Sequence, residues 1–236
     1  MLNIKLPLWY QVAQSLRADI ISRPADDLRL PTERDLAAQY DVSLITVRQA
    51  LKSIEEEGLI TRHRRRGTFI NPDAITSRPL ELLGSLDAVI AQQTSETSEV
   101  LERSVITVPE QFEDQFGPGA KVVKFRRLRH DDGEVRSYAV NYVREKEGLQ
   151  VRSDQLQTAP MTRILREMGV RLHRVQDTVE ARLADAEVAE LVGLEIGSPI
   201  LYFIGTTFDA NDRVVDIACI CYRGDRYRFA VGFDVD

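Results

Sequence analysis

The sequence predicts an α+β protein of two domains, and three observations support this fold class. Before residue 58, apolar side chains recur at helical spacing in three segments, and two short β-rich segments with a basic loop between them follow. Residues 71–79 then lose all periodicity between Pro72 and Pro79, as a linker does. Beyond them, β-rich segments joined by tight turns alternate with short helices, which favours a central antiparallel sheet over a doubly wound parallel one.

The first two helices are expected to share a small core with the third. Residues 7–22 form a helix whose apolar face consists of Val12, Leu16 and Ile20. The second helix begins after Pro31, because the Thr32 hydroxyl can cap it and Asp35 suits the exposed amides of the first turn. A short break at residues 40–43 then separates it from the third helix.

The third helix is expected to begin at the cap residue Ser43 and to end at Gly58, which suits a left-handed stop. Its inward face follows the helical period: Val47, Ala50, Leu51 and Ile54. Its outward face carries Ile45, Gln49 and Lys52, with Thr46, Arg48 and Ser53 on the flanks. A helix with this polar outward face suits the major groove of a DNA duplex.

A basic ribbon is predicted after the third helix, with strands at residues 59–61 and 68–70 and a loop at residues 62–67. The loop holds four arginines within five residues: Arg62, Arg64, Arg65 and Arg66. Lysine and arginine side chains neutralise phosphates, so this loop beside a polar helix indicates DNA binding. The alternative is an ordinary solvated helix next to a charged loop.

The net charge of −6 is compatible with DNA binding once it is divided along the chain. Residues 1–71 hold 11 Lys and Arg against 9 Asp and Glu, a net of +2, and the remainder holds 20 against 28, a net of −8. The positive excess is therefore local to the predicted ribbon, and the local field matters more than the total charge.

The N-terminal segment resembles the winged helix-turn-helix of GntR-type bacterial transcription regulators. The matching stretches are PLWYQVAQSLRADII, LPTERDLA, VSLITVRQAL, EEEGLI and RGTFI. The resemblance implies DNA contact by the second helix, the start of the third helix and the wing. Together with the outward face of the third helix, these regions give the candidate DNA-binding residues Arg34, Ser43, Leu44, Ile45, Thr46, Arg48, Gln49, Lys52, Arg64, Arg65, Arg66, Gly67 and Thr68. Leu44 stands where the family commonly has a base-contacting arginine, so it is expected either to touch thymine methyl groups or to pack.

The second half of the chain is predicted to contain strands at residues 105–108, 121–129, 135–143, 176–183, 199–208 and 213–222. Tight turns at residues 130–134 and 211–212 join two pairs of these strands into hairpins. Helical spacing appears at residues 80–93, 162–168 and 184–192, and Gly193 ends the last of these helices.

This half resembles the UTRA effector domain of the HutC branch, through FRRLRHDDGE, VQDTVEARLADAEVAELVGL, GSPIL and YRGDRYRF. The resemblance implies a chorismate-lyase-like fold with a central antiparallel sheet, a bound small-molecule effector and homodimerisation. Arginines equivalent to Arg127 and Arg129 hold the anionic group in relatives that bind phosphorylated sugars, whereas the alternative here is that they brace the sheet by pairing with acids. The candidate effector residues are Ser85, Asp87, Arg127, Arg129, Tyr138, Asn141 and Tyr222.

Two departures within that site change the expected effector. Asp87 stands where phosphate binders tend to have a small hydroxyl residue, and a carboxylate there would repel a phosphate. Ala139 stands where amino-sugar responders have a ligand-binding glutamate. An amino-sugar phosphate is therefore disfavoured, and a carboxylate-bearing or less polar metabolite is favoured.

Together these features predict a cytoplasmic, homodimeric, ligand-responsive repressor that binds a palindromic DNA operator. Its expected parts are a DNA-binding domain at 1–71, a linker at 72–79 and an effector-binding and dimerisation domain at 80–236. The alternative is a small-molecule enzyme of the chorismate-lyase fold, but the chain has no nucleotide-binding or nucleophile-elbow motif, and His63, His130 and His173 do not cluster as metal ligands. We therefore expect no catalytic residue, metal or cofactor, no membrane span or signal peptide, and reduced thiols at Cys219 and Cys221.

Overall fold

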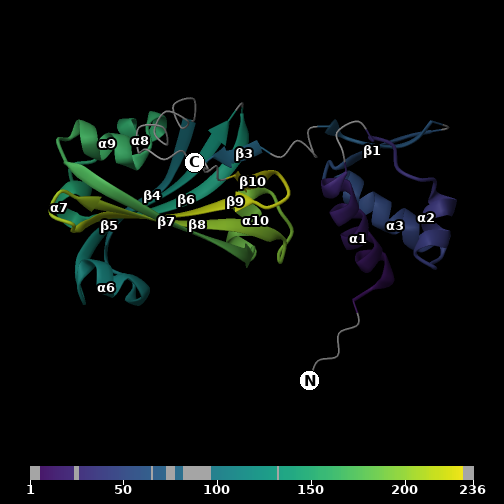
Figure 1. The fold of residues 1–236 in the computed structure, drawn as a ribbon, viewed down its shortest axis with the longest axis horizontal. Coiled ribbons are helices and arrows are strands. Elements are labelled where there is room, and N and C mark those ends of the chain that lie inside the picture. Colours follow the sequence, from purple (N-terminus) through teal and green to yellow (C-terminus); the bar gives the residue numbers. More distant parts are fainter. Residues whose placement is uncertain are drawn as a thin grey trace, which may run out of the picture. The chain divides into compact units, whose positions relative to one another are not determined.

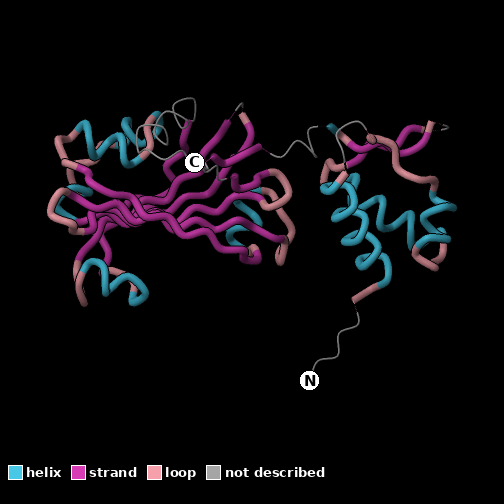
Figure 2. Tube along the Cα trace, in the orientation of Figure 1, coloured by secondary structure: helices cyan, strands magenta, loops and turns pink. Residues whose placement is uncertain are grey.

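The computed structural model describes residues 6–23, 27–64, 66–72, 78–81, 97–131 and 133–230. Its contacts divide the chain into two compact units, Met1–Arg78 and Pro79–Asp236 (Figure 1). The first described unit is mainly helical with a two-stranded ribbon, and the second is mainly sheet (Figure 2).

The N-terminal unit contains α1 (Leu8–Ser22), α2 (Glu33–Gln39) and α3 (Leu44–Glu56), followed by β1 (Ile60–His63) and β2 (Gly67–Ile70). The predicted caps of α2 and α3 are confirmed. Asp35 N–H donates to the Thr32 hydroxyl and Thr32 N–H donates to the Asp35 carboxylate, while Thr46 N–H donates to the Ser43 hydroxyl at 3.2 Å. Gly58 takes the left-handed conformation with φ of 77°.

One apolar core joins the three helices and the ribbon. The predicted inward residues of α1 and α3 are all buried in it. The segment before α2 contributes Leu30, and the ribbon with the residue before it contributes Leu59, Ile60 and Ile70. Strand β1 reaches His63, and Arg62 pairs with Thr68 in the antiparallel register, so the prediction that Arg62 lies in the wing loop is wrong. The backbone of Arg29 adds an isolated bridge to Phe69 at the outer edge of the ribbon.

The C-terminal unit is built on a six-stranded antiparallel sheet in the order β4-β5-β6-β9-β8-β7. These strands are β4 (Thr97–Thr107), β5 (Lys121–Asp131), β6 (Glu134–Arg144), β7 (Leu172–Leu183), β8 (Pro199–Asp209) and β9 (Val214–Arg223). A separate two-stranded sheet pairs β3 (Arg78–Glu81) with β10 (Tyr227–Ala230). The antiparallel sheet and the hairpins predicted from the sequence are therefore confirmed.

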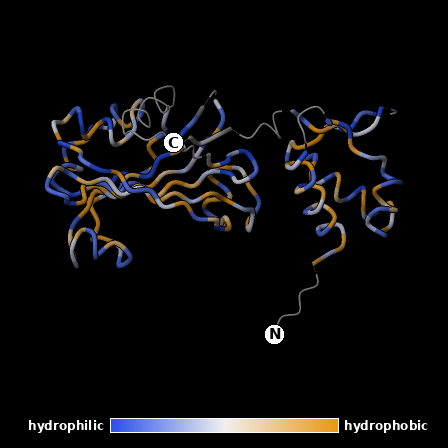
Figure 3. The backbone as a smooth tube through the Cα atoms, in the orientation of Figure 1, coloured by the Kyte–Doolittle hydropathy of each residue, from blue (hydrophilic) through white to orange (hydrophobic). Residues whose placement is uncertain are grey.

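Short helices cover both faces of this sheet: η1 (Glu110–Phe112), α6 (Glu113–Phe116), α7 (Glu145–Gly148), α8 (Ser153–Thr158), α9 (Met161–Glu167) and α10 (Ala186–Val192). Helices α8 and α9 pack on one face, and α6 and α10 lie on the other (Figure 1). Hydrophobic stretches run along the strands between these layers (Figure 3). The two faces of the sheet therefore contribute to different apolar clusters.

Several boundaries differ from the sequence prediction. Strand β3 occupies residues 78–81, where the end of the linker and the start of a helix were expected, and the rest of that predicted helix lies outside the described residues. Strand β4 begins at Thr97, in a segment whose sequence shows polarity and no strand pattern. An edge strand with one solvated face accommodates such polar residues without an apolar signal.

Candidate nucleic-acid interface and ligand site

The outward face of α3 is open to solvent, as the sequence predicted. Ile45 is 76% exposed and Leu44 is 37% exposed, and neither belongs to the apolar core of the unit. Gln49 and Lys52 are also exposed, whereas the Thr46 hydroxyl lies 2.9 Å from that of Ser43. Leu44 therefore does not pack in this core, and its contact with thymine methyl groups stays a prediction.

Arg48 is held at the edge of this face by an acid from the preceding helix. Its Nε donates to Glu33 Oε2 at 2.7 Å, and Arg62 of strand β1 donates to the other oxygen, Glu33 Oε1. Burial alone raises the pKa of Glu33, but hydrogen bonds and charge from Arg48 and Arg62 outweigh it and leave the pKa below its usual value. One carboxylate therefore links α2, α3 and the ribbon.

The tip of the wing presents cations to solvent. Arg64 and Arg66 are exposed, Arg65 lies outside the described residues, and Gly67 has φ of 108°, a conformation that favours glycine. The sequence prediction missed Arg29, whose guanidinium lies 5.9 Å from the Phe69 ring centre and whose Nη2 donates to the Arg66 carbonyl at 3.5 Å. Together with the backbone bridge between Arg29 and Phe69, these contacts place Arg29 beside the wing, although the two are far apart in sequence.

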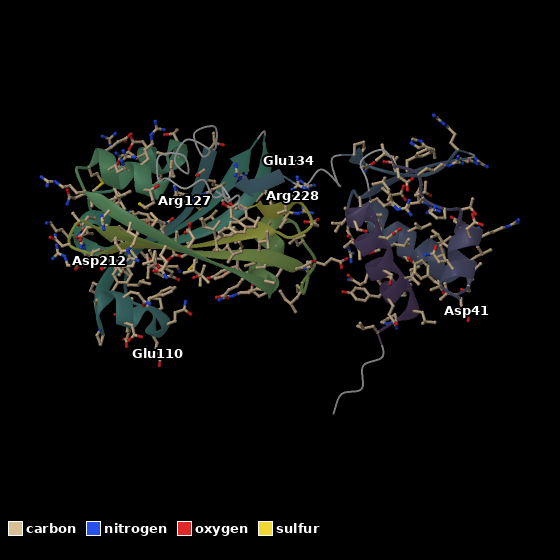
Figure 4. All side chains as sticks on the ribbon, viewed as in Figure 1. Asp41, Glu110, Arg127, Glu134, Asp212 and Arg228 are labelled. Atoms are coloured by element: carbon tan, nitrogen blue, oxygen red, sulfur yellow. The ribbon has the colours of Figure 1, made fainter. Side chains whose placement is uncertain are left out.

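Two further candidates, Arg34 and Thr68, lie in α2 and β2. Arg34 is exposed on the first turn of α2, and Asp41 occupies the left-handed turn between α2 and α3 with φ of 49° (Figure 4). Thr68 is half-buried, and its carbonyl accepts the N–H of Leu30 at 3.1 Å. Thr68 therefore braces the ribbon through its backbone.

In the C-terminal unit, Arg127 is fully buried in strand β5, within the sheet (Figure 4). Its Nη1 donates to the carbonyls of Leu156 and Ala159 at 3.2 Å each, and its Nη2 donates to Asn141 Oδ1 at 3.0 Å. The carbonyls belong to the end of α8, where the helix dipole favours a cation. These hydrogen bonds to helix carbonyls and to an amide brace the sheet through Arg127.

Arg129 lies two residues further along β5, on the same face, and is 4% exposed. It pairs across the strands with Ser137 of β6, which is fully buried. Among the described residues, neither Arg129 Nη1 nor Ser137 Oγ has a hydrogen-bond partner. A buried donor without a partner carries a substantial desolvation cost, so this pair is suited to receive the oxygens of a ligand.

Asp216 of β9 completes the buried polar group, and the sequence prediction missed it. Asn141 Nδ2 donates to both carboxylate oxygens of Asp216, at 2.9 and 3.0 Å, so Asn141 bridges Asp216 and Arg127. Burial raises the pKa of Asp216 to about 7, although the Asn141 hydrogen bond and the charges of Arg127 and Arg129 act in the opposite direction. The available signal was a single acid inside an apolar strand, VVDIACICY.

The other predicted ligand residues lie on different faces of the six-stranded sheet. Asn141 and Tyr222 are buried on the face of Arg127, since Tyr222 pairs with Ser137. Tyr138 lies on the opposite face, packs in the cluster of α10 and accepts a hydrogen bond from Arg126 Nε at 2.6 Å. Its grouping with Arg127 is therefore wrong, because neighbouring residues of a strand point to opposite faces. Ser85 and Asp87 lie outside the described residues.

Both units match known protein families. Residues 8–70 match the family described as bacterial regulatory proteins, gntR family, and residues 91–228 match the UTRA domain. The chain belongs to the UTRA-containing gntR family. It is a DNA-binding transcription regulator, and UTRA domains of this family bind small-molecule effectors.

Its relatives within this family align over nearly their whole length. The HTH-type transcriptional repressor NagR of Bacillus subtilis is 26% identical over 227 residues, covering 95% of this chain and 93% of NagR. The repressor PhnF of Mycolicibacterium smegmatis is 27% identical over 222 residues, covering 92% and 90%. The crystal structure of PhnF matches 95% of this chain and all of that chain with a TM-score of 0.57.

These names point to transcription regulators and away from enzymes. Among the described helices, none combines the length and the apolar character needed to span a bilayer.

Proposed function

We propose that this UTRA-containing regulator is a cytoplasmic homodimeric repressor, which a small anionic metabolite releases from a two-fold symmetric operator. In this proposal residues 1–71 bind one half-site per subunit, and residues 80–236 dimerise and bind the effector. The repressor names of NagR and PhnF support the direction of regulation.

The proposed DNA surface combines the outward face of α3 with the wing. Its residues are Arg34, Ser43, Leu44, Ile45, Thr46, Arg48, Gln49, Lys52, Arg64, Arg65, Arg66, Gly67 and Thr68, to which we add Arg29. Exposed Ile45 and Leu44 suit thymine methyl groups, while arginine can form a bidentate pair with guanine. The wing arginines are suited to phosphates.

The observation that carries the effector proposal is the buried pair of Arg129 and Ser137, which are paired on adjacent strands and have polar atoms without a partner among the residues that the structure describes. A guanidinium beside a hydroxyl recognises a carboxylate or phosphate oxygen. The proposed site also holds two acids, Asp216 and Asp87, and carboxylates repel a doubly charged phosphate more strongly than a singly charged carboxylate. We therefore favour a carboxylate over a doubly charged phosphate ester, and the proposed site is Arg127, Arg129, Ser137, Asn141, Asp216 and Tyr222, with Ser85 and Asp87.

A thermal-shift screen of the full-length protein tests this effector class. Small carboxylates and phosphate esters of matching size are compared, because a ligand at 100 times its Kd stabilises the native state by about 2.7 kcal/mol. We expect a carboxylate to raise Tm and to weaken DNA binding in a gel-shift assay.

The Arg129→Gln variant should lose the thermal shift, whereas Arg163→Gln, which removes an arginine that is 42% exposed in α9, should keep it. A carboxylate that stabilises both variants equally would place the effector elsewhere. Stabilisation by phosphate esters alone would overturn the preference for a carboxylate.

A further inference from the structure

Glu33 occupies an unexpected place for an acid in a DNA-binding unit. It lies in the first turn of α2, its side chain is 26% exposed, and each of its oxygens accepts from a different arginine. The second of these arginines, Arg62, is tied to α3 as well, because its backbone N–H donates to Glu55 Oε1 at 3.2 Å. Glu33 is thereby the common partner of a helix α3 side chain and a wing strand side chain.

We propose that Glu33 is a positioning residue for sequence-specific DNA recognition, which holds Arg48 in the orientation that reaches a base edge. This inference rests on the proposed DNA contact of Arg48. Glu33 itself is not required to touch DNA.

The geometry of the Arg48 contact supports this role. The bond to Glu33 uses Nε, so the two terminal nitrogens of the guanidinium remain as the fork that fits guanine O6 and N7. The Arg48 side chain is 60% exposed, and without Glu33 it would sample many rotamers. An arginine already held near its bound orientation loses less entropy when it binds, and a misdirected one distinguishes bases less well.

The charge of Glu33 makes the proposal testable, since specific and non-specific binding should respond in opposite directions. Removing a carboxylate from a surface that faces phosphates should leave non-specific affinity unchanged or increase it. Because Arg48 is then no longer held in its orientation, affinity for the operator should at the same time fall. A purely structural role would lower both affinities together.

The experiment uses the full-length protein and a duplex that the wild-type protein selects from a random-sequence library, with a scrambled duplex of equal length as the non-specific reference. Glu33→Gln should lower the ratio of specific to non-specific affinity about tenfold, with non-specific affinity equal to or above that of the wild type. Asp19→Asn is the matched control, because it removes one carboxylate charge from α1, where Asp19 is 42% exposed, pairs with Arg23 at 2.9 Å and lies outside the proposed DNA surface. The ratio should not change in this control.

A double-mutant cycle with Arg48→Ala tests whether Glu33 acts through Arg48. Once Arg48 is absent, Glu33→Gln should change the affinity ratio less than twofold. Independent, multiplying effects of the two substitutions would overturn the proposal, as would an unchanged ratio in Glu33→Gln alone. If Arg48→Ala itself leaves the ratio unchanged, the proposed contact of Arg48 fails first, so the two failures are distinguishable.

Discussion

Asp216 is a carboxylate without solvent access in an apolar strand, and its environment links protonation to stability. Its pKa is about 7 in the folded protein and near the ordinary value of 3.8 when unfolded. Between pH 4 and pH 7 the folded protein keeps the Asp216 proton, whereas the unfolded chain loses it. The stabilising contribution of Asp216 is therefore present below pH 4 and is lost as pH rises through 7. A shift of about three units corresponds to at most about 4 kcal/mol.

The Asp216→Asn variant should remove this dependence. Because an amide does not titrate, the wild type should lose stability relative to the variant between pH 4 and pH 7. Urea unfolding at several pH values measures the difference between the two free energies of unfolding. Parallel pH profiles for the two proteins would show that Asp216 does not titrate in this range.

Arg127 and Arg129 lie on one face of β5, but we expect different consequences when each is replaced. Arg127→Met removes the hydrogen bonds to Asn141 and to the carbonyls of Leu156 and Ala159, and it leaves those carbonyls without that donor. An unsatisfied buried group costs about 1–3 kcal/mol, so this variant should be destabilised by about 3 kcal/mol in chemical unfolding. Arg129→Met removes a group whose Nη1 has no partner among the described residues, so it should be destabilised less. Equal losses of stability in both variants would contradict this division.

At the level of elements, the wing should determine the salt dependence of DNA binding. Arg64 and Arg66 are exposed at its tip, and the slope of log K against log salt falls by about 0.9 for each phosphate that is no longer neutralised. Replacing both with Ala should therefore reduce the magnitude of the slope by about 2. Replacing Arg152, which is 71% exposed in the C-terminal unit, provides the control and should leave the slope unchanged. A slope unchanged in the wing variant would show that these two arginines do not bind phosphate.

The same elements show which structural features were readable from the sequence. The apolar period of α3, the cap at Ser43 and the glycine stop at Gly58 are local signals, and the structure reproduces them. Helices α7 and α8 have four and six residues, too few for a helical period to be recognised. Strand β10 forms through pairing with a distant segment, which no local pattern indicates.

The candidate sites show the same difference between local sequence signals and contacts that form only in the fold. The exposed face of α3 and the arginines of the wing were predictable, because periodicity and composition identify them. The roles of Glu33 and Asp216 depend on contacts between separate elements, so no spacing in the sequence indicates them. Tyr138, in contrast, could have been excluded from the ligand site on sequence alone, because alternation along a strand puts its side chain on the other face of the sheet from Ala139 and Asn141.

At the level of the whole molecule, the division of charge matches a division of roles. The net positive segment contains the proposed DNA surface, whereas the remaining chain carries a net of −8 and is repelled by a polyanion. In the proposed mechanism, a ligand bound in the C-terminal unit therefore releases the operator by changing the arrangement of the proposed dimer, and not by neutralising the DNA surface. Such a mechanism is a coupling free energy between two sites, and it must be reciprocal.

This reciprocity provides the last prediction. If saturating effector weakens operator binding by a given factor, saturating operator DNA must weaken the two effector-binding steps of the proposed dimer by that same factor in total, which is its square root for each of two equivalent sites. Operator affinity is measured by gel shift with and without effector, and effector affinity by calorimetry with and without operator, at one salt concentration and pH. The scrambled duplex serves as control and should reduce effector affinity less than the operator does. Unequal factors would show that the effector also changes the oligomeric state or binds at a second site, which would contradict release through a single dimer equilibrium.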